Sequence, residues 1–240
     1  MNHVDYSQWV QFILEIFSQY GLHPPQIEES PLVLECGCGT GTVAIHLTLR
    51  GYQVEGFDSS LAMIGRARNK VRTLNKPPKF LVMDFLDLDV NNHFDVVLSL
   101  YDSVNYLMDE KVLAEFFLKV KGALKPDGLF IFDVCTRYNS LANFNGKVES
   151  ESGSGFKYIR RMNFDKVNNI QENRFEIQLK SDRDKVYVET HAQKIYEVNN
   201  IVAALKNAGL TIENSYEGFD FSPPKDDALR VHFVCRNLTS

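Results

Sequence analysis

Short apolar runs alternate with longer amphipathic segments between residues 5 and 138, and this alternation limits the possible folds more than any other feature of the chain. Apolar runs bounded by turn signals are typical of buried parallel strands, whereas apolar residues spaced three and four apart are typical of helices. The expected strands are Leu32–Glu35, Gln53–Phe57, Phe80–Met83, Phe94–Leu100 and Gly128–Val134. The expected helices are residues 5–20, Thr42–Arg50, Ser60–Leu74 and Glu110–Leu124. Successive strand and helix units of this kind predict a doubly wound α/β sheet.

Beyond residue 138 the pattern changes. After a stretch rich in Ser, Gly and Asn, apolar and polar residues alternate with a period of two in three segments, which predicts an antiparallel β-meander. These segments are Phe156–Asp165, Ile170–Leu179 and Val186–Tyr196. In the first segment, one face carries Phe156, Tyr158, Arg160, Met162 and Phe164. We therefore expect one face of the meander to be buried.

The α/β pattern then returns with a helix at Val198–Ala208 and strands at Leu210–Tyr216 and Arg230–Cys235. The connection between these last two strands is too short for a crossover helix, so they are expected to pair antiparallel. Earlier in the chain, the Lys-Pro-Asp-Gly sequence at residues 125–128 predicts a turn before the fifth strand.

The expected fold is therefore α/β, with a doubly wound, seven-stranded, mainly parallel sheet whose last strand is antiparallel. Residues 1–138 and 197–240 are expected to form this sheet domain. Residues 139–196 are expected to form an inserted antiparallel β subdomain that acts as a lid.

Composition narrows the possible partners. The net charge is −5, from 26 Lys and Arg against 31 Asp and Glu, so no broad cationic field favours nucleic acid. No apolar run approaches the roughly 20 residues that a membrane span needs, and no secretory leader opens the chain. The four scattered cysteines predict a cytoplasmic protein with reduced thiols. Cys36 and Cys38 lack the further ligands of a tetrahedral site, so no metal is expected.

A glycine-rich turn follows the first expected strand, with Gly37, Gly39 and Gly41 at alternate positions. Glycine permits positive φ and leaves no Cβ, so a ligand can lie against the backbone at the carboxyl end of the strand. A dinucleotide fingerprint would place its third glycine at position 42, which is a threonine. The turn therefore fits a dinucleotide poorly.

Acidic residues stand at the ends of three neighbouring strands. Glu35, just before the glycine turn, suits a cationic amino-acid group, and Asp58 is placed to accept hydrogen bonds from two ribose hydroxyls. Asp84 can accept from an adenine amine, with Phe85 beside the ring. Each acid taken alone could be an ordinary helix N-cap, and each glycine an ordinary turn. Together they describe an unphosphorylated adenosine that bears a positive group, which is S-adenosylmethionine.

With these motifs the sequence resembles class I S-adenosylmethionine-dependent methyltransferases over roughly residues 5–237. The resemblance implies that the Glu35–Gly41 loop holds the methionine part, Asp58 the ribose and Asp84-Phe85 the adenine. The candidate cofactor contacts are Glu35, Cys36, Gly37, Gly39, Thr40, Gly41, Asp58, Ser59, Met63, Asp84, Phe85, Leu100 and Asn105. Ser59 or Ser60 could also be a helix N-cap, and Met63 a core residue.

More narrowly, residues 100–107 and 189–196 look like those of bacterial small-molecule methyltransferases with an inserted β-meander. Such relatives often begin with an additional segment that folds over the cofactor. This chain starts near the Tyr-x-x-Trp that follows that segment, here Tyr6 to Trp9. The resemblance therefore implies a less enclosed cofactor.

Methyl transfer is an in-line displacement, which needs alignment and, where the acceptor carries a proton, a base. His191 is the first candidate base, since imidazole titrates near neutral pH and this residue shares a strand face with Tyr187 and Glu189. The alternative is a structural pair of His191 and Glu189. Asp102 is the second candidate, or it braces the following residues as an Asx-turn.

Three hypotheses follow from the sequence. The first is an enzyme that moves a methyl group from S-adenosylmethionine, releasing S-adenosylhomocysteine, to a nitrogen or oxygen of a small-molecule acceptor. The meander would then close over an acceptor pocket beside Tyr101–Tyr106, with His191 inside it. The second is a non-catalytic S-adenosylmethionine-binding sensor or activating subunit. An NAD-dependent oxidoreductase is disfavoured by Thr42 and by the lack of a Tyr-x-x-x-Lys pair. The acceptor, the methylated atom and the oligomeric state are left open.

Overall fold

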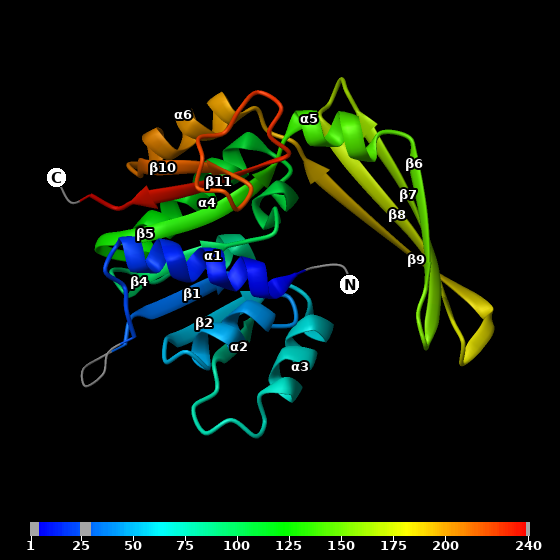
Figure 1. Cartoon of the computed structure of the whole chain (residues 1–240), viewed down its shortest axis with the longest axis horizontal. Helices are drawn as coiled ribbons and strands as arrows, with labels where there is room; N and C mark the ends of the chain where they lie inside the picture. The colour runs from blue at the N-terminus through cyan, green and yellow to red at the C-terminus, as the bar shows by residue number, and fades with distance from the viewer. Residues whose placement is uncertain (1–4, 25–29, 239–240) are drawn as a thin grey trace.

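A seven-stranded sheet forms the centre of the computed structural model, which describes residues 5–24 and 30–238 (Figure 1). Its strand order is β10-β11-β5-β4-β1-β2-β3, and β11 runs antiparallel to both of its neighbours. The strands are β1 (Leu32–Cys36), β2 (Gln53–Asp58), β3 (Lys79–Val82), β4 (Phe94–Ser99), β5 (Leu124–Cys135), β10 (Thr211–Glu217) and β11 (Arg230–Arg236). The doubly wound, mainly parallel sheet that the sequence predicts is confirmed.

Helices cover both faces of this sheet. One core lies under α1, α2 and α3, and a second, rich in phenylalanine, lies under α4 and α6 (Figure 1). The helices are α1 (Tyr6–Gln19), α2 (Thr42–Thr48), α3 (Leu61–Lys70), α4 (Glu110–Ala123) and α6 (Val198–Ala208). Local signals set their ends, since the Asp5 carboxylate accepts hydrogen bonds from the first turn of α1, and Gly209 ends α6 at a φ of +77°.

The expected turn at residues 125–128 is wrong as a boundary, because β5 begins earlier and runs through it. The register between β4 and β5 shifts here, and Asp127 has a φ of +61°. Asn237 bridges the irregularity, since its carbonyl accepts from the Asp127 N–H at 2.9 Å and its N–H donates to the Gly128 carbonyl at 2.9 Å. The Pro and Gly therefore form a bulge within a strand.

A second, four-stranded antiparallel sheet follows β5, in the order β6-β7-β8-β9. Its strands are β6 (Lys147–Ser152), β7 (Phe156–Asp165), β8 (Ile170–Leu179) and β9 (Asp182–Lys194). The sequence predicts the last three, whereas β6 was not predicted. Its sequence, Lys-Val-Glu-Ser-Glu-Ser, has one apolar residue and therefore no alternating signal. Pairing with β7 supplies the order that its own composition lacks.

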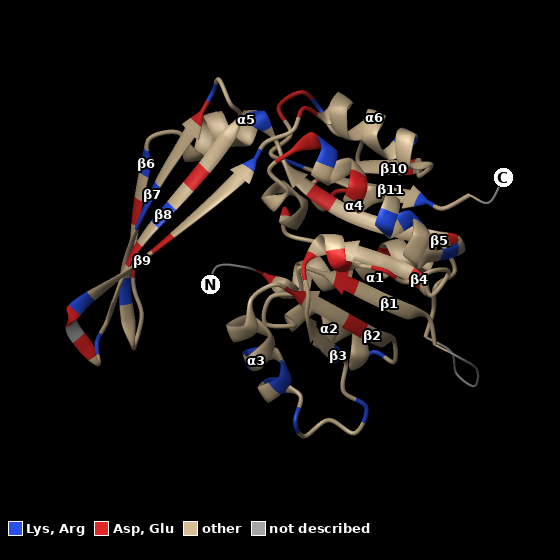
Figure 2. Cartoon of the chain, turned by 180° about the vertical axis from the view of Figure 1, so that it is seen from behind, with Lys and Arg blue, Asp and Glu red and all other residues tan. Residues whose placement is uncertain are grey.

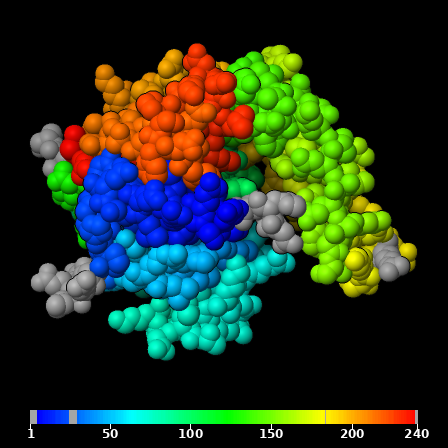
Figure 3. All heavy atoms as spheres, in the orientation of Figure 1, coloured from blue at the N-terminus to red at the C-terminus, as the bar shows by residue number. Residues whose placement is uncertain are grey.

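The four-stranded sheet projects from the α/β domain and leaves a hollow beside α1 and α3 (Figure 3). Its base is attached by α5 (Arg137–Asn139) and the π-helical turn η3 (Ser140–Phe144). On the predicted buried face, Met162 and Phe164 near this base are buried, whereas Phe156, Tyr158 and Arg160 are only half-buried. We call this face, which also carries Asn173, Phe175, Glu189, His191 and Gln193 by strand register, the inner face. The expected burial is therefore limited to the base.

Candidate cofactor and acceptor site

The glycine turn between β1 and α2 has positive φ at Gly37, Gly39 and Gly41, of +71°, +55° and +72°. A Cβ on Gly37 would lie 3.0 to 3.2 Å from Ser103 and Phe85, and one on Gly41 would lie 2.4 Å from the Phe80 ring. At Gly39, in contrast, nothing lies within 4 Å of that position. Gly37 and Gly41 therefore allow close packing, and Gly39 leaves the backbone open to a ligand.

Asp58, at the end of β2, ties this turn to the next helix. Its Oδ2 accepts from the Gly39 N–H at 2.9 Å, and its Oδ1 accepts from the Ser60 N–H at 2.8 Å. The residue is half-buried, and a carboxylate has acceptor capacity for about four hydrogen bonds. Asp58 therefore keeps capacity for two hydroxyl donors beside the open backbone of Gly39.

Glu35 lies deeper than the sequence suggests. It is 5% exposed, and its Oε2 accepts from the Ala44 N–H in the first turn of α2 at 2.9 Å. Burial raises the pKa of its carboxyl to about 8, the Ala44 hydrogen bond opposes this rise and the charge of Asp58 adds to it. Glu35 thus braces the glycine turn, and a cation bound nearby would favour its ionised form.

Asp84 and Phe85 lie at the start of the short helix η1 (Phe85–Asp87), after β3. Asp84 caps this helix by accepting from the Leu86 N–H at 3.2 Å, so the N-cap alternative describes it correctly. Its side chain is nevertheless exposed at the sheet edge. The Phe85 ring packs edge-on against Phe57 and Phe116, at centroid distances of 5.8 and 4.9 Å. This packing leaves Phe85 half-buried beside Gly37.

The remaining predicted cofactor contacts differ in exposure. The Cys36 side chain is fully buried in the core, so only its backbone faces the turn. Thr40 Oγ1 is 2.7 Å from Lys70 Nζ, which donates to it. Ser59 is exposed, and the N-cap of α3 is Ser60. Met63 is 37% exposed on α3, so it is not a core methionine.

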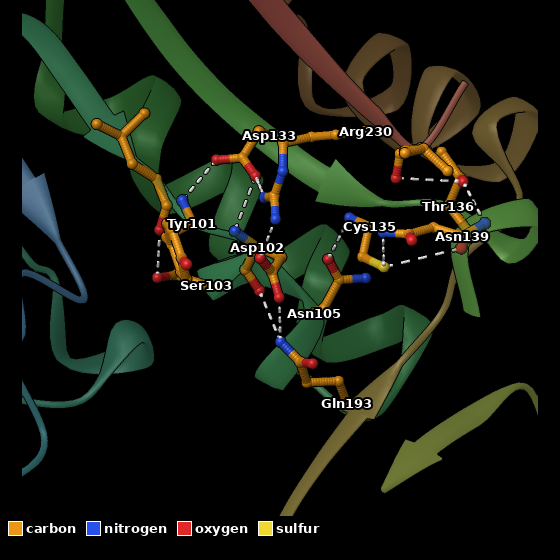
Figure 4. A network of polar contacts seen from close by, with 12 residues as sticks. Tyr101, Asp102, Ser103, Asn105, Asp133, Cys135, Thr136, Asn139, Gln193 and Arg230 are labelled. Carbon is orange, nitrogen blue, oxygen red and sulfur yellow. Dashed lines mark hydrogen bonds and ion pairs between the residues drawn. The ribbon is translucent and has the colours of Figure 1, made fainter. Parts of the chain in front are cut away.

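Asn105 takes a structural position that the sequence reasoning missed. It is fully buried, its Nδ2 donates to the Lys194 carbonyl at 2.7 Å and its Oδ1 accepts from the Cys135 N–H at 3.1 Å (Figure 4). It therefore joins η2 (Ser103–Tyr106) to β5 and β9, and we do not retain it as a cofactor contact. Leu100 is also nearly buried, and its carbonyl accepts from Ser103 Oγ at 2.6 Å.

Between β4 and η2 the backbone makes a strained elbow. Tyr101 and Asp102 have consecutive positive φ values of 63° and 50°, which residues with a Cβ rarely adopt. Asp133, at the end of β5, accepts from both of their N–H groups, at 2.6 and 2.8 Å (Figure 4). Its carboxylate therefore holds the elbow, and the Asp102 side chain makes no cap hydrogen bond of the Asx-turn kind.

Arg230 joins the two carboxylates at this elbow. Its guanidinium pairs with Asp133 and lies 2.8 Å from Asp102 Oδ1. The same group lies 5.4 Å from the ring centroids of both Trp9 and Tyr101, which contact each other. Burial raises the pKa values of both Asp carboxyls, and the charge of Arg230 opposes the rise. Asp102 is thus already engaged in an ion pair, which suits a positioning group better than a free base.

A chain of hydrogen bonds connects the elbow to the base of the four-stranded sheet. Gln193 Nε2 donates to Asp102 Oδ2 at 2.5 Å (Figure 4). Gln171 Nε2 donates to Gln193 Oε1 at 3.1 Å. Ser140 Oγ in turn donates to Gln171 Oε1 at 2.8 Å. All three of these residues are buried. The base of the inner face is therefore fixed relative to the elbow.

Further out on the inner face, His191 faces the α/β domain. Its Nδ1 lies 3.3 Å from the hydroxyl oxygen of Tyr106, and its Nε2 lies 3.7 Å from Glu189 Oε2. The rings of Tyr106 and Phe175 stand nearly perpendicular to the imidazole. His191 and Tyr106 are 41% and 46% exposed, so both border the open hollow.

Four residues at this edge were given no role by the sequence reasoning: Tyr6, Trp9, Asp133 and Arg230. Tyr6 and Trp9 lie one helical turn apart on α1. Burial raises the pKa of Tyr6, and the charge of Glu35 adds to the rise. Asp133 interrupts an apolar strand, and the rule that located Asp58 and Asp84 at strand ends also points to it. No comparable signal marks Arg230.

These residues fit S-adenosylmethionine. The open backbone at Gly39, the remaining acceptor capacity of Asp58 and the exposed carboxylate of Asp84 follow one another along the sheet edge. They suit the amino-acid part, the ribose and the adenine amine, respectively. The two hydroxyls of a ribose can donate hydrogen bonds to the Asp58 carboxylate, whereas an ionised phosphate group would be repelled by it because both are negatively charged.

Comparison with known proteins agrees with this assignment. The methyltransferase domain family matches residues 33–128. A Geobacillus sp. protein that carries a provisional methyltransferase name is 28% identical over 238 residues, which cover 98% of this chain and 94% of that protein. The structure of an S-adenosylmethionine-dependent methyltransferase from Clostridium acetobutylicum has the same fold, with a TM-score of 0.86, 24% identity and coverage of 100% and 94%.

A second solved structure contains bound S-adenosylmethionine. It is an amino pentose methyltransferase from Micromonospora echinaspora, with a TM-score of 0.71, 18% identity and coverage of 95% and 91%. The chain is therefore a class I S-adenosylmethionine-dependent methyltransferase, and S-adenosylmethionine is its cofactor. Among the helices of the described residues, none has the length and apolarity to cross a membrane.

Gly39→Ala tests whether the open space at the glycine turn belongs to the cofactor. We expect the variant to fold with a loss of about 1 kcal/mol, because alanine tolerates the left-handed region at roughly that cost. Its affinity for S-adenosylhomocysteine, measured by calorimetry, should fall at least about tenfold, since the Cβ occupies ligand space. Gly21→Ala is the matched control, with a φ of +70° and nothing within 4 Å. Equal affinity in both variants would contradict the assignment.

Glu35→Gln tests the buried carboxyl. Because the folded-state pKa of Glu35 is raised, the folded protein holds this proton more firmly than the unfolded chain, and stability is lost as pH rises from about 4.5 to about 8. The amide can still accept from Ala44. Without cofactor, the variant should therefore have a higher Tm than the wild type at pH 8, by roughly 2–4 °C per kcal/mol, and a smaller gain at pH 5. A gain that does not depend on pH would contradict this.

Asp133→Asn tests the support of the elbow. Breaking a buried ion pair by removing one charge costs about 3–5 kcal/mol, and we expect that loss in the free energy of urea unfolding. Glu55→Gln is the control, because it breaks an exposed pair with Lys79, whose side chain is 76% exposed, and should cost at most about 1 kcal/mol. Similar losses in the two variants would show that Asp133 contributes no more to the free energy of unfolding than an exposed ion pair does.

Proposed function

We propose that this methyltransferase acts on a nitrogen or oxygen atom of a small-molecule acceptor held in the hollow between the sheet edge and the inner face. The observation that carries the proposal is the contact of Tyr106 with His191, 3.3 Å apart across that hollow. This contact supports the view that His191, an imidazole of the projecting sheet, lies at the same sheet edge as Gly39 and Asp58. Residues 139–196 would then form the acceptor lid.

The lining of the hollow supports a small organic acceptor. Aromatic rings of Tyr106, Tyr158 and Phe175 are available for packing, and Glu189 and His191 supply polar contacts. Arg160 is engaged by Asn173 and stacks over Phe175 at 5.5 Å. Along the described part of the sheet, acidic and basic residues alternate, an arrangement that does not favour a nucleic-acid backbone (Figure 2).

In the proposed reaction, S-adenosylmethionine supplies an electrophilic methyl group on its sulfonium sulfur. The protein holds the acceptor in line with that group, which is the main source of catalysis in a displacement of this kind. Elbow residues Tyr101 and Asp102, fixed by Asp133, form the wall beside the acceptor. His191 takes up the proton that the acceptor atom must lose.

A panel of amines, phenols and carboxylates tests this function through acceptor-dependent release of S-adenosylhomocysteine. We expect turnover with at least one amine or phenol. His191→Ala should lower kcat by roughly 10²-fold and leave the affinity for S-adenosylhomocysteine nearly unchanged, because a lost base slows the chemical step alone. His23→Ala, at an exposed position outside the hollow, should behave as wild type. Normal turnover of His191→Ala would make the residue structural.

A further inference from the structure

Both ring nitrogens of His191 already face protein groups. Nδ1 is 3.3 Å from the Tyr106 hydroxyl oxygen, and Nε2 is 3.7 Å from Glu189 Oε2. This second distance is too long for a hydrogen bond, but the negative charge of the Glu189 carboxylate favours the proton on the nitrogen nearer to it, Nε2. Nδ1 is then an acceptor, and the Tyr106 hydroxyl is its donor. The lone pair of His191 Nδ1 is therefore engaged by Tyr106 and does not itself face an acceptor molecule.

Of these three residues, Tyr106 is the one that belongs to the α/β domain, which carries the glycine turn. It ends η2, the turn that follows the elbow, whereas His191 and Glu189 belong to the projecting sheet. It therefore presents its hydroxyl to the projecting sheet from the α/β side of the contact. Its side chain is 46% exposed to the hollow.

We propose that Tyr106 is a catalytic residue whose hydroxyl contacts the acceptor atom and passes that atom's proton to His191. The inference rests on the proposed function and deepens it, since it changes which protein atom touches the acceptor. His191 and Glu189 become positioning residues that act through Tyr106.

The transfer balances as follows. The lone pair of the acceptor atom forms the new bond to the methyl carbon, and the pair of the broken carbon–sulfur bond stays on sulfur in S-adenosylhomocysteine. The acceptor proton goes to Tyr106 Oη as the tyrosine proton moves to His191 Nδ1. The tyrosine is neutral before and after, and the imidazolium cation is stabilised by the Glu189 carboxylate.

The surroundings favour a neutral Tyr106. Burial raises the pKa of its hydroxyl to about 12, and the Asp102 and Asp58 carboxylates add to the rise while Arg160 opposes it. A stable tyrosinate at neutral pH is thereby disfavoured, so the hydroxyl serves as a donor to Nδ1. The perpendicular ring of Phe175, 5.7 Å from the imidazole, limits rotation of His191 away from this contact.

The tautomer of His191 tests the relay without any acceptor. Nitrogen-15 spectra at alkaline pH distinguish the two neutral forms of imidazole, and assignment by comparison with His191→Ala identifies the signals. We expect the proton on Nε2, with Nδ1 as the bare nitrogen. A proton on Nδ1 would overturn the proposal, since Tyr106 could not then donate there.

A double-mutant cycle tests catalysis with the best acceptor of the amine and phenol panel. Tyr106→Phe and His191→Ala should each lower kcat roughly 10²-fold, and the double variant should lie within about threefold of the slower single variant, because groups that act as a unit are not additive. Independent roles would give about 10⁴-fold. Tyr20→Phe, which loses a surface hydrogen bond to Asn214, is the matched control and should keep full activity.

The two proposals fail in different ways. Wild-type turnover with an unimpaired Tyr106→Phe variant, or an additive double variant, overturns the relay and leaves the proposed function intact. Absence of turnover with the whole panel, together with intact S-adenosylhomocysteine binding, overturns both. Binding of S-adenosylhomocysteine should be nearly equal in all variants, because none of the substitutions touches the glycine turn.

Discussion

The Asp133 carboxylate holds together the parts of the molecule on which the site depends. It accepts from two consecutive left-handed residues, Tyr101 and Asp102, and it pairs with Arg230 in a place that water scarcely reaches. Such backbone strain persists only where surrounding contacts overdetermine it. Through Asp102 and Gln193 the same interaction reaches the base of the four-stranded sheet. One buried ion pair therefore fixes the direction in which the chain leaves β4, and it also fixes the position of the inner face.

In the function that we propose, this arrangement divides one sheet edge into two halves. The glycine turn and the strand-end acids Asp58 and Asp84 provide the half for the cofactor, where the backbone is open at Gly39. Beyond the elbow, Tyr106 meets His191 of the projecting sheet and provides the half for the acceptor. Ligands of open α/β sheets bind at this edge because helices cover both faces. An insertion after β5 can therefore add an acceptor surface without altering the cofactor half.

Local patterns in the sequence were sufficient to predict the sheet, and they also produced the cofactor contacts that we propose. Apolar runs and helical spacing located the strands and helices, and the acids at strand ends followed from the direction of a parallel sheet. Asp84 caps a short helix and is still exposed at the sheet edge, whereas Glu35 is more deeply buried than the pattern suggests.

What the sequence could not provide depends on contacts between distant segments. Strand β6 has no alternating signal and is ordered by β7, and the bulge at residues 125–128 is stabilised by Asn237. Arg230 pairs with residues about 100 positions earlier, and Asn105 is buried by Lys194 and Cys135. The engagement of His191 Nδ1 by Tyr106 likewise needed the fold, because Tyr106 lies 85 residues away in the chain.

The most direct measurement is a crystal structure with S-adenosylhomocysteine bound. If one edge carries both halves of the site, the ribose hydroxyls will lie on Asp58, the amino-acid part along Gly39, and the sulfur will face the space bordered by Tyr106 and the inner face. A ligand bound elsewhere, or a sulfur turned away from Tyr106, would contradict this arrangement.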